Sequence, residues 1–254
     1  MSQRVVLIIA GSDSGGGAGI QADLRACYDH GVFGATAITA VTAQNTRGVI
    51  RVDAIPPIGL RAQLDAVLGD MEVHAIKIGM LGTAELVDAV ADVLEAQALR
   101  PPVVLDPVMV ATSGDRLLDE AAVDALRSRL FPLASLATPN LPEAQVLAGS
   151  DEGDRVGEWA MTAPCAVLVT GGDASGVEVL DQLFNGEQSR NWRHARIAGG
   201  PFHGTGCTLS SAIAARLALG DALEAAADAG IGYVRARLKT AWRPGSGSAV
   251  LGPR

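Results

Sequence analysis

Short runs of β-branched and other apolar residues recur along this chain and alternate with amphipathic segments. Most of the runs are apolar throughout, which indicates strands that are buried on both faces. Such strands are typical of parallel sheets covered by helices, because a sheet with one wet face would show alternating polar residues. We predict strands of this kind at residues 5–10, 35–41, 75–79, 103–106, 135–138 and 166–170.

The segments between these runs have helical spacing. Leu86, Val90 and Leu94 share one face of a predicted helix at residues 83–97, and another helix is predicted at residues 119–130. The chain is therefore predicted to form a doubly wound α/β fold, with a mostly parallel central sheet flanked by helices. No repeat or low-complexity linker divides its 254 residues, so we expect a single domain over residues 1–254.

The last third of the chain departs from this alternation. Between residues 176 and 197, two alternating segments flank Asn185-Gly186, a dipeptide suited to a tight hairpin turn, so we expect a small antiparallel excursion. Helices are predicted at about residues 205–219 and 221–240. The tail that follows, about residues 243–254, is rich in Gly, Ser and Pro, and we expect it to fray.

Composition and charge exclude several classes of protein. Apolar residues make up 48% of the chain and charged residues 19%, which supplies a buried core. The net charge of -8, without a basic run, opposes binding to nucleic acid. The longest N-terminal apolar run, residues 5–10, is too short for a membrane span and lacks signal-peptide flanks, so we expect a cytoplasmic protein with no membrane partner.

The segment His203-Gly204-Thr205-Gly206-Cys207-Thr208 is a glycine-rich turn at the start of a predicted helix. Glycines let the backbone approach a ligand, and the first N–H groups of the helix favour an anion such as phosphate. The pKa of the Cys207 thiol is expected to fall below its free value of about 8.5 at such a position, which suits a base. The alternative is that Cys207 is an apolar filler and the glycines only permit close packing.

A second glycine-rich segment, residues 11–19, follows the first predicted strand and precedes a helix that contains Asp23. It is not a P-loop, because no Lys and Ser/Thr follow its glycines, and it lacks the spacing of the dinucleotide fingerprint. We expect a loop that approaches a polar small molecule closely, with Asp23 as a hydrogen-bonding partner. Asp23 is equally compatible with a solvated aspartate at a helix start.

Two carboxylates follow predicted strands, at the sheet edge where ligand crevices form. Asp106 is the last residue of the predicted strand at 103–106, and Glu143 follows another strand, three residues after Asn140. Oxygen ligands near a phosphate site suit Mg²⁺ that is held largely through water and phosphate oxygens. The alternative for Asn140 and Glu143 is an ordinary capping box.

Six motifs occur in order along nearly the whole chain: AGSDSGGGAGIQAD at residues 10–23, TAVTAQNT at 39–46, KIGMLG at 77–82, LDPVMVATSGDRLL at 105–118, TPNLPEA at 138–144 and HGTGCTLSSAIAA at 203–215. Together they resemble the hydroxymethylpyrimidine and phosphomethylpyrimidine kinases of thiamine biosynthesis, within the ribokinase-like superfamily. The resemblance implies a ribokinase-like fold, ATP as co-substrate, Mg²⁺ as cofactor and a small pyrimidine as acceptor. It also implies a second transfer, onto the phosphate just added.

The resemblance also implies roles for individual residues. Asp23 and Gln44 would hydrogen-bond the ring nitrogens and amino group of the pyrimidine, and Cys207 would be the base for the acceptor hydroxyl. The complete sets are Gly11, Asp23, Gln44, Met80 and Val108 for the pyrimidine; Gly204, Thr205, Gly206 and Cys207 for the anion hole; Asn140, Glu143, Thr170 and Gly172 for the nucleotide; and Asp106 and Glu143 for Mg²⁺.

The sequence departs from this family in places. Thr170-Gly171-Gly172-Asp173 stands where many members have Lys-Gly-Gly-His, with the Lys near the nucleotide phosphates, and Thr112 stands where some members have Lys. These differences bear on nucleotide affinity and on the second transfer. Two alternatives remain open, a pyridoxal kinase of the same fold and a pyrimidine-binding sensor without catalysis. We also expect a homodimer or a higher homo-oligomer.

Overall fold

The computed structural model describes residues 3–252 except 98–99, 111–113, 115–116 and 151. Thr112, part of the motif at 105–118, and tail residues 253–254 therefore lie outside the described residues. Within the described part, a nine-stranded central sheet has the order β3-β2-β1-β4-β5-β6-β7-β8-β9. Its strands are β1 (Val5–Asp13), β2 (Phe33–Asn45), β3 (Gly48–Ala54), β4 (Ala75–Ile78), β5 (Val103–Leu105), β6 (Leu136–Ala137), β7 (Ala166–Val169), β8 (Glu178–Asn185) and β9 (Gln188–Ala195).

The six predicted strands, β1, β2, β4, β5, β6 and β7, form the parallel part of the sheet. Alternate residues of β1 explain why its first six positions, residues 5–10, are all apolar. Leu7 and Ile9 belong to one buried cluster, whereas Val6 and Ile8 belong to another on the opposite face. Because helices cover both faces of the sheet, the side chains on both faces of this part of the strand are buried and apolar.

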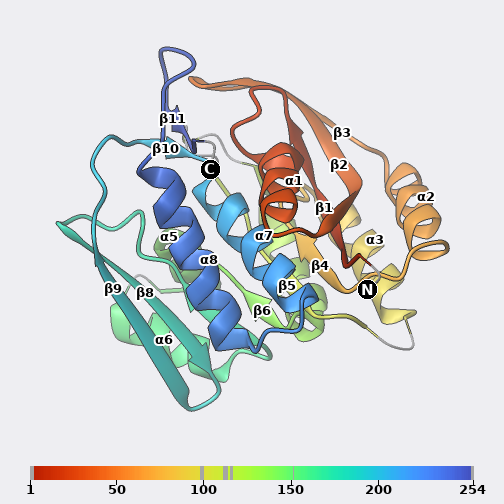
Figure 1. Cartoon of the computed structure of the whole chain (residues 1–254). Helices are drawn as coiled ribbons and strands as arrows, with labels where there is room; N and C mark the ends of the chain where they lie inside the picture. Colours follow the sequence, from red (N-terminus) through yellow and green to blue (C-terminus); the bar gives the residue numbers. More distant parts are fainter. Residues whose placement is uncertain (1–2, 98–99, 111–113, 115–116, 151, 253–254) are drawn as a thin grey trace.

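Helices cover both faces of this sheet (Figure 1). The first layer packs on the cluster that contains Val6 and consists of α1 (Gly19–Asp29), α7 (Thr205–Ala218) and α8 (Leu223–Leu238). The second layer consists of α2 (Pro57–Leu68), α3 (Ala84–Glu95), α4 (Glu120–Ala125), α5 (Leu141–Ala148) and α6 (Gly153–Thr162). A π-helical turn, Leu126–Leu130, and a 3₁₀ turn, Phe131–Leu133, extend α4, so the helix predicted at 119–130 is regular only in its first half. The doubly wound α/β prediction is confirmed.

Antiparallel strands lie at both edges of the sheet. The predicted hairpin is confirmed as β8 and β9, which pair up to Asn185 and Gln188. A second antiparallel partner, β3 against β2, was not predicted. Most of β3 is exposed, yet Ile50, Val52 and Ala54 alternate with Arg51 and Asp53, a short strand signal that the prediction did not use.

The C-terminal tail does not fray over the described residues. Ala249 and Val250 form β11 (Ala249–Val250), which pairs in parallel with β10 (Phe202–His203), and both residues are buried. The amide of Ser248 donates to the carbonyl oxygen of Thr46 over 2.7 Å. The prediction of a frayed tail is wrong here, because Ala249 and Val250, two apolar residues within the Gly/Ser-rich stretch, are buried against β10, which directly precedes α7.

The carboxyl ends of the parallel strands meet at one edge of the sheet, and α7 begins at the same edge. Loops after β1, β4, β5, β6 and β7 all line one cavity there. Among the described helices, none has the length and apolar character needed to cross a membrane.

Candidate active site

A cavity of about 780 Å³ lies at the carboxyl edge of the parallel strands. This volume falls within the usual range for small-molecule and cofactor sites. All predicted site residues except Asp23 line it: Gly11, Gln44, Met80, Val108, Asp106, Asn140, Glu143, Thr170, Gly172, Gly204, Thr205, Gly206 and Cys207.

Helix α7 opens directly into this cavity. Its N-cap, Gly204, has φ +83°, and a β-carbon at this position would overlap the carbonyl oxygen of Gly17, so only glycine fits. No described side chain caps α7, and its first turn contains no acidic residue. The N–H groups of Thr205, Gly206 and Cys207 have no acceptor within the helix and are available to an anion.

Cys207 lines this cavity, and the residue as a whole is half-buried. Desolvation raises its pKa to about 12, and the negative charges of Asp23 and Asp106 act in the same direction. The charge of Lys77 and a hydrogen bond from the amide of Gly19 lower the pKa but do not compensate. The predicted fall in the thiol pKa is therefore wrong, because burial outweighs the effect of the helix terminus.

Asp23 lies beneath the cavity rather than on its wall. The Nζ atom of Lys77 donates to both carboxylate oxygens of Asp23 over 3.0 Å, and the hydroxyl of Ser211 donates to Oδ1 over 2.7 Å. Lys77 and Asp23 are both fully buried, and Lys77, unlike Asp23, lines the cavity. In the structure Asp23 is the counter-ion of a buried lysine and not a solvated aspartate, and its binding to the pyrimidine stays a prediction.

The sequence analysis gave Lys77 no role in the site, although a lysine within an apolar strand indicates one. It is the single charged residue of the strand Ala75–Ile78, all of which is buried. A buried ammonium group needs a paired carboxylate, and a lysine in an otherwise apolar strand indicates such a pair. The sequence does not reveal the partner, which comes from α1.

Two carboxylates face the cavity from the loop after β5 and from α5. Burial raises the pKa of Asp106, which accepts a hydrogen bond from the hydroxyl of Ser210 over 3.0 Å. Burial, together with the charge of Asp106, raises the pKa of Glu143 to about 8. Both Glu143 oxygens accept backbone amides, from Met109 over 3.2 Å and from Asn140 over 2.9 Å. The capping box, given above as the alternative for these two residues, is present, since Asn140 Oδ1 also accepts from the amide of Glu143.

These residues fit a loosely held magnesium ion. The hydroxyl oxygen of Thr138 is buried without a partner among the described residues, and it lines the cavity with Asp106 and Glu143. Across the described residues, no group of three His, Cys, Asp or Glu side chains is arranged to hold a metal. A cation here would complete its shell with water and phosphate oxygens, which is the usual mode of Mg²⁺.

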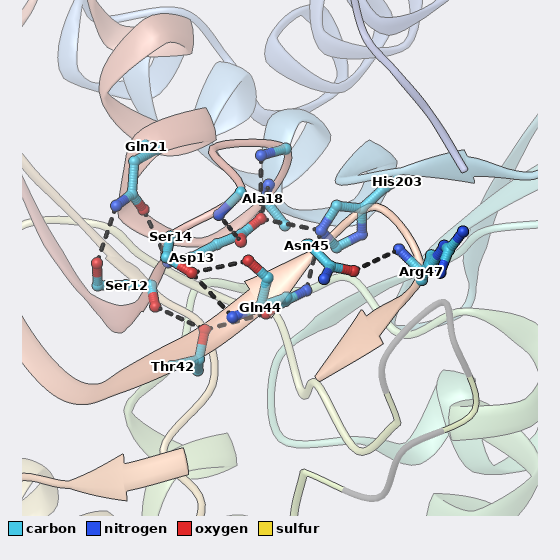
Figure 2. Close-up of polar contacts among 12 residues, drawn as sticks. Ser12, Asp13, Ser14, Ala18, Gln21, Thr42, Gln44, Asn45, Arg47 and His203 are labelled. Atoms are coloured by element: carbon cyan, nitrogen blue, oxygen red, sulfur yellow. Dashed lines mark hydrogen bonds and ion pairs between the residues drawn. The ribbon is translucent and has the colours of Figure 1, made fainter. Parts of the chain in front are cut away.

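The loop after β1 is organised by Asp13, which the sequence analysis missed (Figure 2). Its carboxylate accepts the amides of Gly15 and Ala18 over 2.8 Å and that of Gly17 over 3.0 Å. Burial alone would raise its pKa, but hydrogen bonds from His203, Ala18 and Gly15 hold it below the ordinary value. An Asp followed by Ser and glycines is a signature of such a turn.

The side of the cavity lined by Thr170 and Gly172 also contains an unpredicted cation, Arg196. Arg196, directly after β9, donates to the carbonyl oxygens of Gly176 over 2.7 Å and Gly172 over 2.6 Å, and also to that of Ala174. The guanidinium thus holds the loop after Thr170, at the place where the resemblance led us to expect a lysine. Nothing in the hairpin sequence marks this long-range contact.

Comparisons with known proteins agree with this geometry. Over 99% of its length, the chain is 48% identical to the hydroxymethylpyrimidine/phosphomethylpyrimidine kinase of Synechococcus elongatus, of which it covers 98%. It resembles the ADP complex of Bacillus subtilis pyridoxal kinase with a TM-score of 0.91 and 35% identity, over 99% of this chain and 97% of that one. For phosphomethylpyrimidine kinase of Clostridium difficile the TM-score is 0.80 and the identity 37%, over 92% and 99%. The chain belongs to the phosphomethylpyrimidine kinase family, whose profile matches residues 13–252.

Proposed function

We propose that this chain transfers the terminal phosphoryl group of ATP to the hydroxymethyl oxygen of 4-amino-5-hydroxymethyl-2-methylpyrimidine, in thiamine biosynthesis. A second transfer, onto the resulting monophosphate, takes place at the same site. The observation that carries the proposal is the open N-terminus of α7, which faces one cavity together with Gln44 and Asp106. The Synechococcus elongatus relative is named for both transfers.

The acceptor occupies the side of the cavity lined by Gly11, Gln44, Met80 and Val108. Gln44 hydrogen-bonds the ring, and the other three enclose it. The amides of Thr205, Gly206 and Cys207 stabilise the negative charge of the phosphoryl group in the transition state of transfer. Such transfer depends on alignment and on fixed donors more than on covalent chemistry.

Cys207 removes the proton of the acceptor hydroxyl as the new oxygen–phosphorus bond forms and the bond to ADP breaks. Because the thiol is protonated in the resting chain, the competent form is a minor thiolate population. The buried charge of Lys77 favours that form. The second transfer starts from a phosphate oxygen and needs no strong base.

Asp106 and Glu143 would hold Mg²⁺, partly through water, and the unpaired hydroxyl of Thr138 would hydrogen-bond to this shell. When bound, Mg²⁺ neutralises charge on the nucleotide phosphates. Asn140, Thr170 and Gly172 bind the nucleotide from the same side of the cavity.

Mass analysis of the products tests this proposal. Hydroxymethylpyrimidine is incubated with Mg²⁺ and ATP, and the mono- and diphosphate are expected in succession. ATP consumption that depends on the acceptor eliminates the sensor alternative. Acceptor binding without any phosphorylated product would instead establish the sensor and overturn the proposal.

A pyridoxal kinase is the second candidate, and one observation favours it. The fold matches the Bacillus subtilis pyridoxal kinase with a TM-score of 0.91, above the 0.80 for the Clostridium difficile phosphomethylpyrimidine kinase. Sequence identity favours the pyrimidine kinases, at 48% for the Synechococcus elongatus relative. The ratio of kcat/KM for the two acceptors decides between the candidates.

We also propose that the chain forms a homodimer or a higher homo-oligomer. Apolar side chains are exposed on the β2–β3 edge of the sheet, with Ile50 76% and Val41 48% exposed. An edge strand with exposed apolar residues is suited to pairing with a second copy. Light scattering after size-exclusion chromatography measures the mass, and a monomer at working concentrations would contradict this.

A further inference from the structure

The ring of His203 connects two parts of the site, and its contacts restrict where its proton lies (Figure 2). Its Nε2 atom lies 2.9 Å from Oδ2 of Asp13 and 3.0 Å from Nε2 of Gln44. An ionised carboxylate can only accept hydrogen bonds, so Nε2 of His203 must carry a hydrogen directed at Asp13. A ring nitrogen in that state does not accept a hydrogen bond from the amino group of Gln44.

Rotating the carboxamide of Gln44 by half a turn removes this conflict. The oxygen and nitrogen of a carboxamide have nearly the same shape, so their assignment follows from the surrounding hydrogen bonds. After rotation, the Gln44 oxygen lies 3.0 Å from Nε2 of His203 and shares with Asp13 the single hydrogen on that nitrogen, in a three-centre hydrogen bond. The Gln44 amino group takes the position 3.2 Å from the hydroxyl oxygen of Thr42. That hydroxyl already donates to the carbonyl oxygen of Ser12 over 3.0 Å, and so it is free to accept.

We propose that His203 is a positioning residue that fixes the carboxamide of Gln44 with its oxygen toward the histidine. One amide hydrogen of Gln44 is then used by Thr42, and the other remains for the ligand. The substrate that receives the phosphoryl group must therefore present an unprotonated ring nitrogen to this remaining hydrogen of Gln44. This inference rests on the proposed function, because it concerns the ring that Gln44 binds.

Close packing holds the histidine in place. A β-carbon on Gly17 would overlap Cδ2 of the His203 ring and would lie 3.0 Å from Cγ1 of Val250. His203 itself is 9% exposed, and its backbone is held in β10 by pairing with β11. His203 directly precedes Gly204, the N-cap of α7. The Asp13–His203 pair therefore also fixes the position of Gln44 and its side of the cavity relative to the N-terminus of α7.

Steady-state kinetics of His203→Ala and His203→Gln test the role of the side chain. We expect His203→Ala to raise KM for the pyrimidine about tenfold, the effect of about one hydrogen bond, with KM for ATP within about twofold. Glutamine places an amide nitrogen at a similar reach, with one hydrogen for Asp13 and one for the Gln44 oxygen, so His203→Gln should restore most of the loss. His74→Gln, at a histidine outside the cavity, is the matched control and should leave both KM values unchanged. Equal losses in all constants, or no restoration by Gln, would overturn the proposal.

A two-bond ¹H–¹⁵N spectrum of the histidine side chains tests the same proposal without any turnover. The His203 signals are identified by their loss in His203→Gln, which also covers the case in which His203→Ala does not fold. We expect Nε2 to be protonated. An unprotonated Nε2 would overturn the inference whatever the activity of the chain. A protonated Nε2 in a chain that phosphorylates no pyrimidine would overturn the proposed function instead.

Discussion

Replacing Lys77 with Met separates two roles for Asp23, counter-ion of a buried cation or ligand of the acceptor ring. Both side chains are fully buried, and Nζ lies 3.0 Å from each carboxylate oxygen. In Lys77→Met the carboxylate retains one described donor, the hydroxyl of Ser211. Removing one partner of a buried ion pair typically costs about 3–5 kcal/mol, because the other charge stays buried without compensation. That loss is large against the total stability of about 5–15 kcal/mol for a typical domain.

Urea unfolding of the wild type, Lys77→Met, Asp23→Asn and the double variant measures this coupling. Each single variant leaves the other member of the pair buried without its main partner, whereas the double variant removes both members. The buried carboxylate of Asp106 loses the charge of Lys77 in both variants that lack the lysine. We therefore expect the double variant to lose less than the sum of the single losses, by about 1–3 kcal/mol. Additive losses would refute the ion pair as the main role of both residues.

The same Asp23→Asn variant gives a catalytic readout. A ring-binding aspartate would raise the KM for the pyrimidine when replaced. A counter-ion leaves that KM unchanged, but its removal takes away a negative charge that raises the pKa of Cys207. We expect an unchanged KM and a pH–rate profile displaced toward lower pH, and a raised KM without that displacement would restore the ring-binding role.

Three further changes probe the rest of the site. Cys207→Ala should slow transfer about 10²–10⁴-fold, the usual contribution of a general base, with acceptor affinity in calorimetry nearly intact, and an unchanged rate would exclude the base role. Because the pKa of the thiol is raised to about 12, the thiolate fraction and kcat/KM of the wild type should rise about tenfold per pH unit from pH 6 to 9, and an early plateau would contradict that pKa. Arg196→Ala should raise the KM for ATP about tenfold with little change in kcat, because three carbonyl contacts of the loop are lost, whereas Arg193→Ala on the exposed face of β9 should change neither. Folding raises the pKa of Glu143 from 4.5 to about 8, so the folded chain binds this proton more tightly and its stability should fall as pH rises from 4.5 to 8. In thermal unfolding, Glu143→Gln should show a smaller fall in stability over this range. An identical pH dependence in the wild type and the variant would contradict this prediction.

The parts of this fold that could be predicted are those where local pattern and burial coincide. Residues 5–10 of β1 are all apolar because both faces of the strand are covered there, and the start of α7 is marked by glycines that the backbone geometry requires. β3 was missed although Ile50, Val52 and Ala54 alternate with Arg51 and Asp53, a strand signal too short to have been used. The tail was wrongly predicted to fray because the prediction relied on its composition, whereas Ala249 and Val250 are buried only by pairing with a strand 47 residues earlier in the chain.

The candidate site shows the same division. Residues in glycine-rich or capping motifs, such as Gly204 and Asn140, could be identified because their function or structure depends on near neighbours in sequence. The pairs Asp23–Lys77 and Asp13–His203 join residues 54 and 190 positions apart. No local pattern contains such contacts, and the pKa of Cys207 depends on them as well as on burial. Its direction was therefore predicted wrongly from the helix terminus alone.

A crystal structure with Mg²⁺, a non-hydrolysable ATP analogue and hydroxymethylpyrimidine tests the central claim most directly. The account predicts the terminal phosphoryl group on the amides of Thr205, Gly206 and Cys207, with the hydroxymethyl oxygen between that group and the Cys207 sulfur. A ring that occupies the opposite end of the cavity, or a terminal phosphoryl group away from the start of α7, would contradict it.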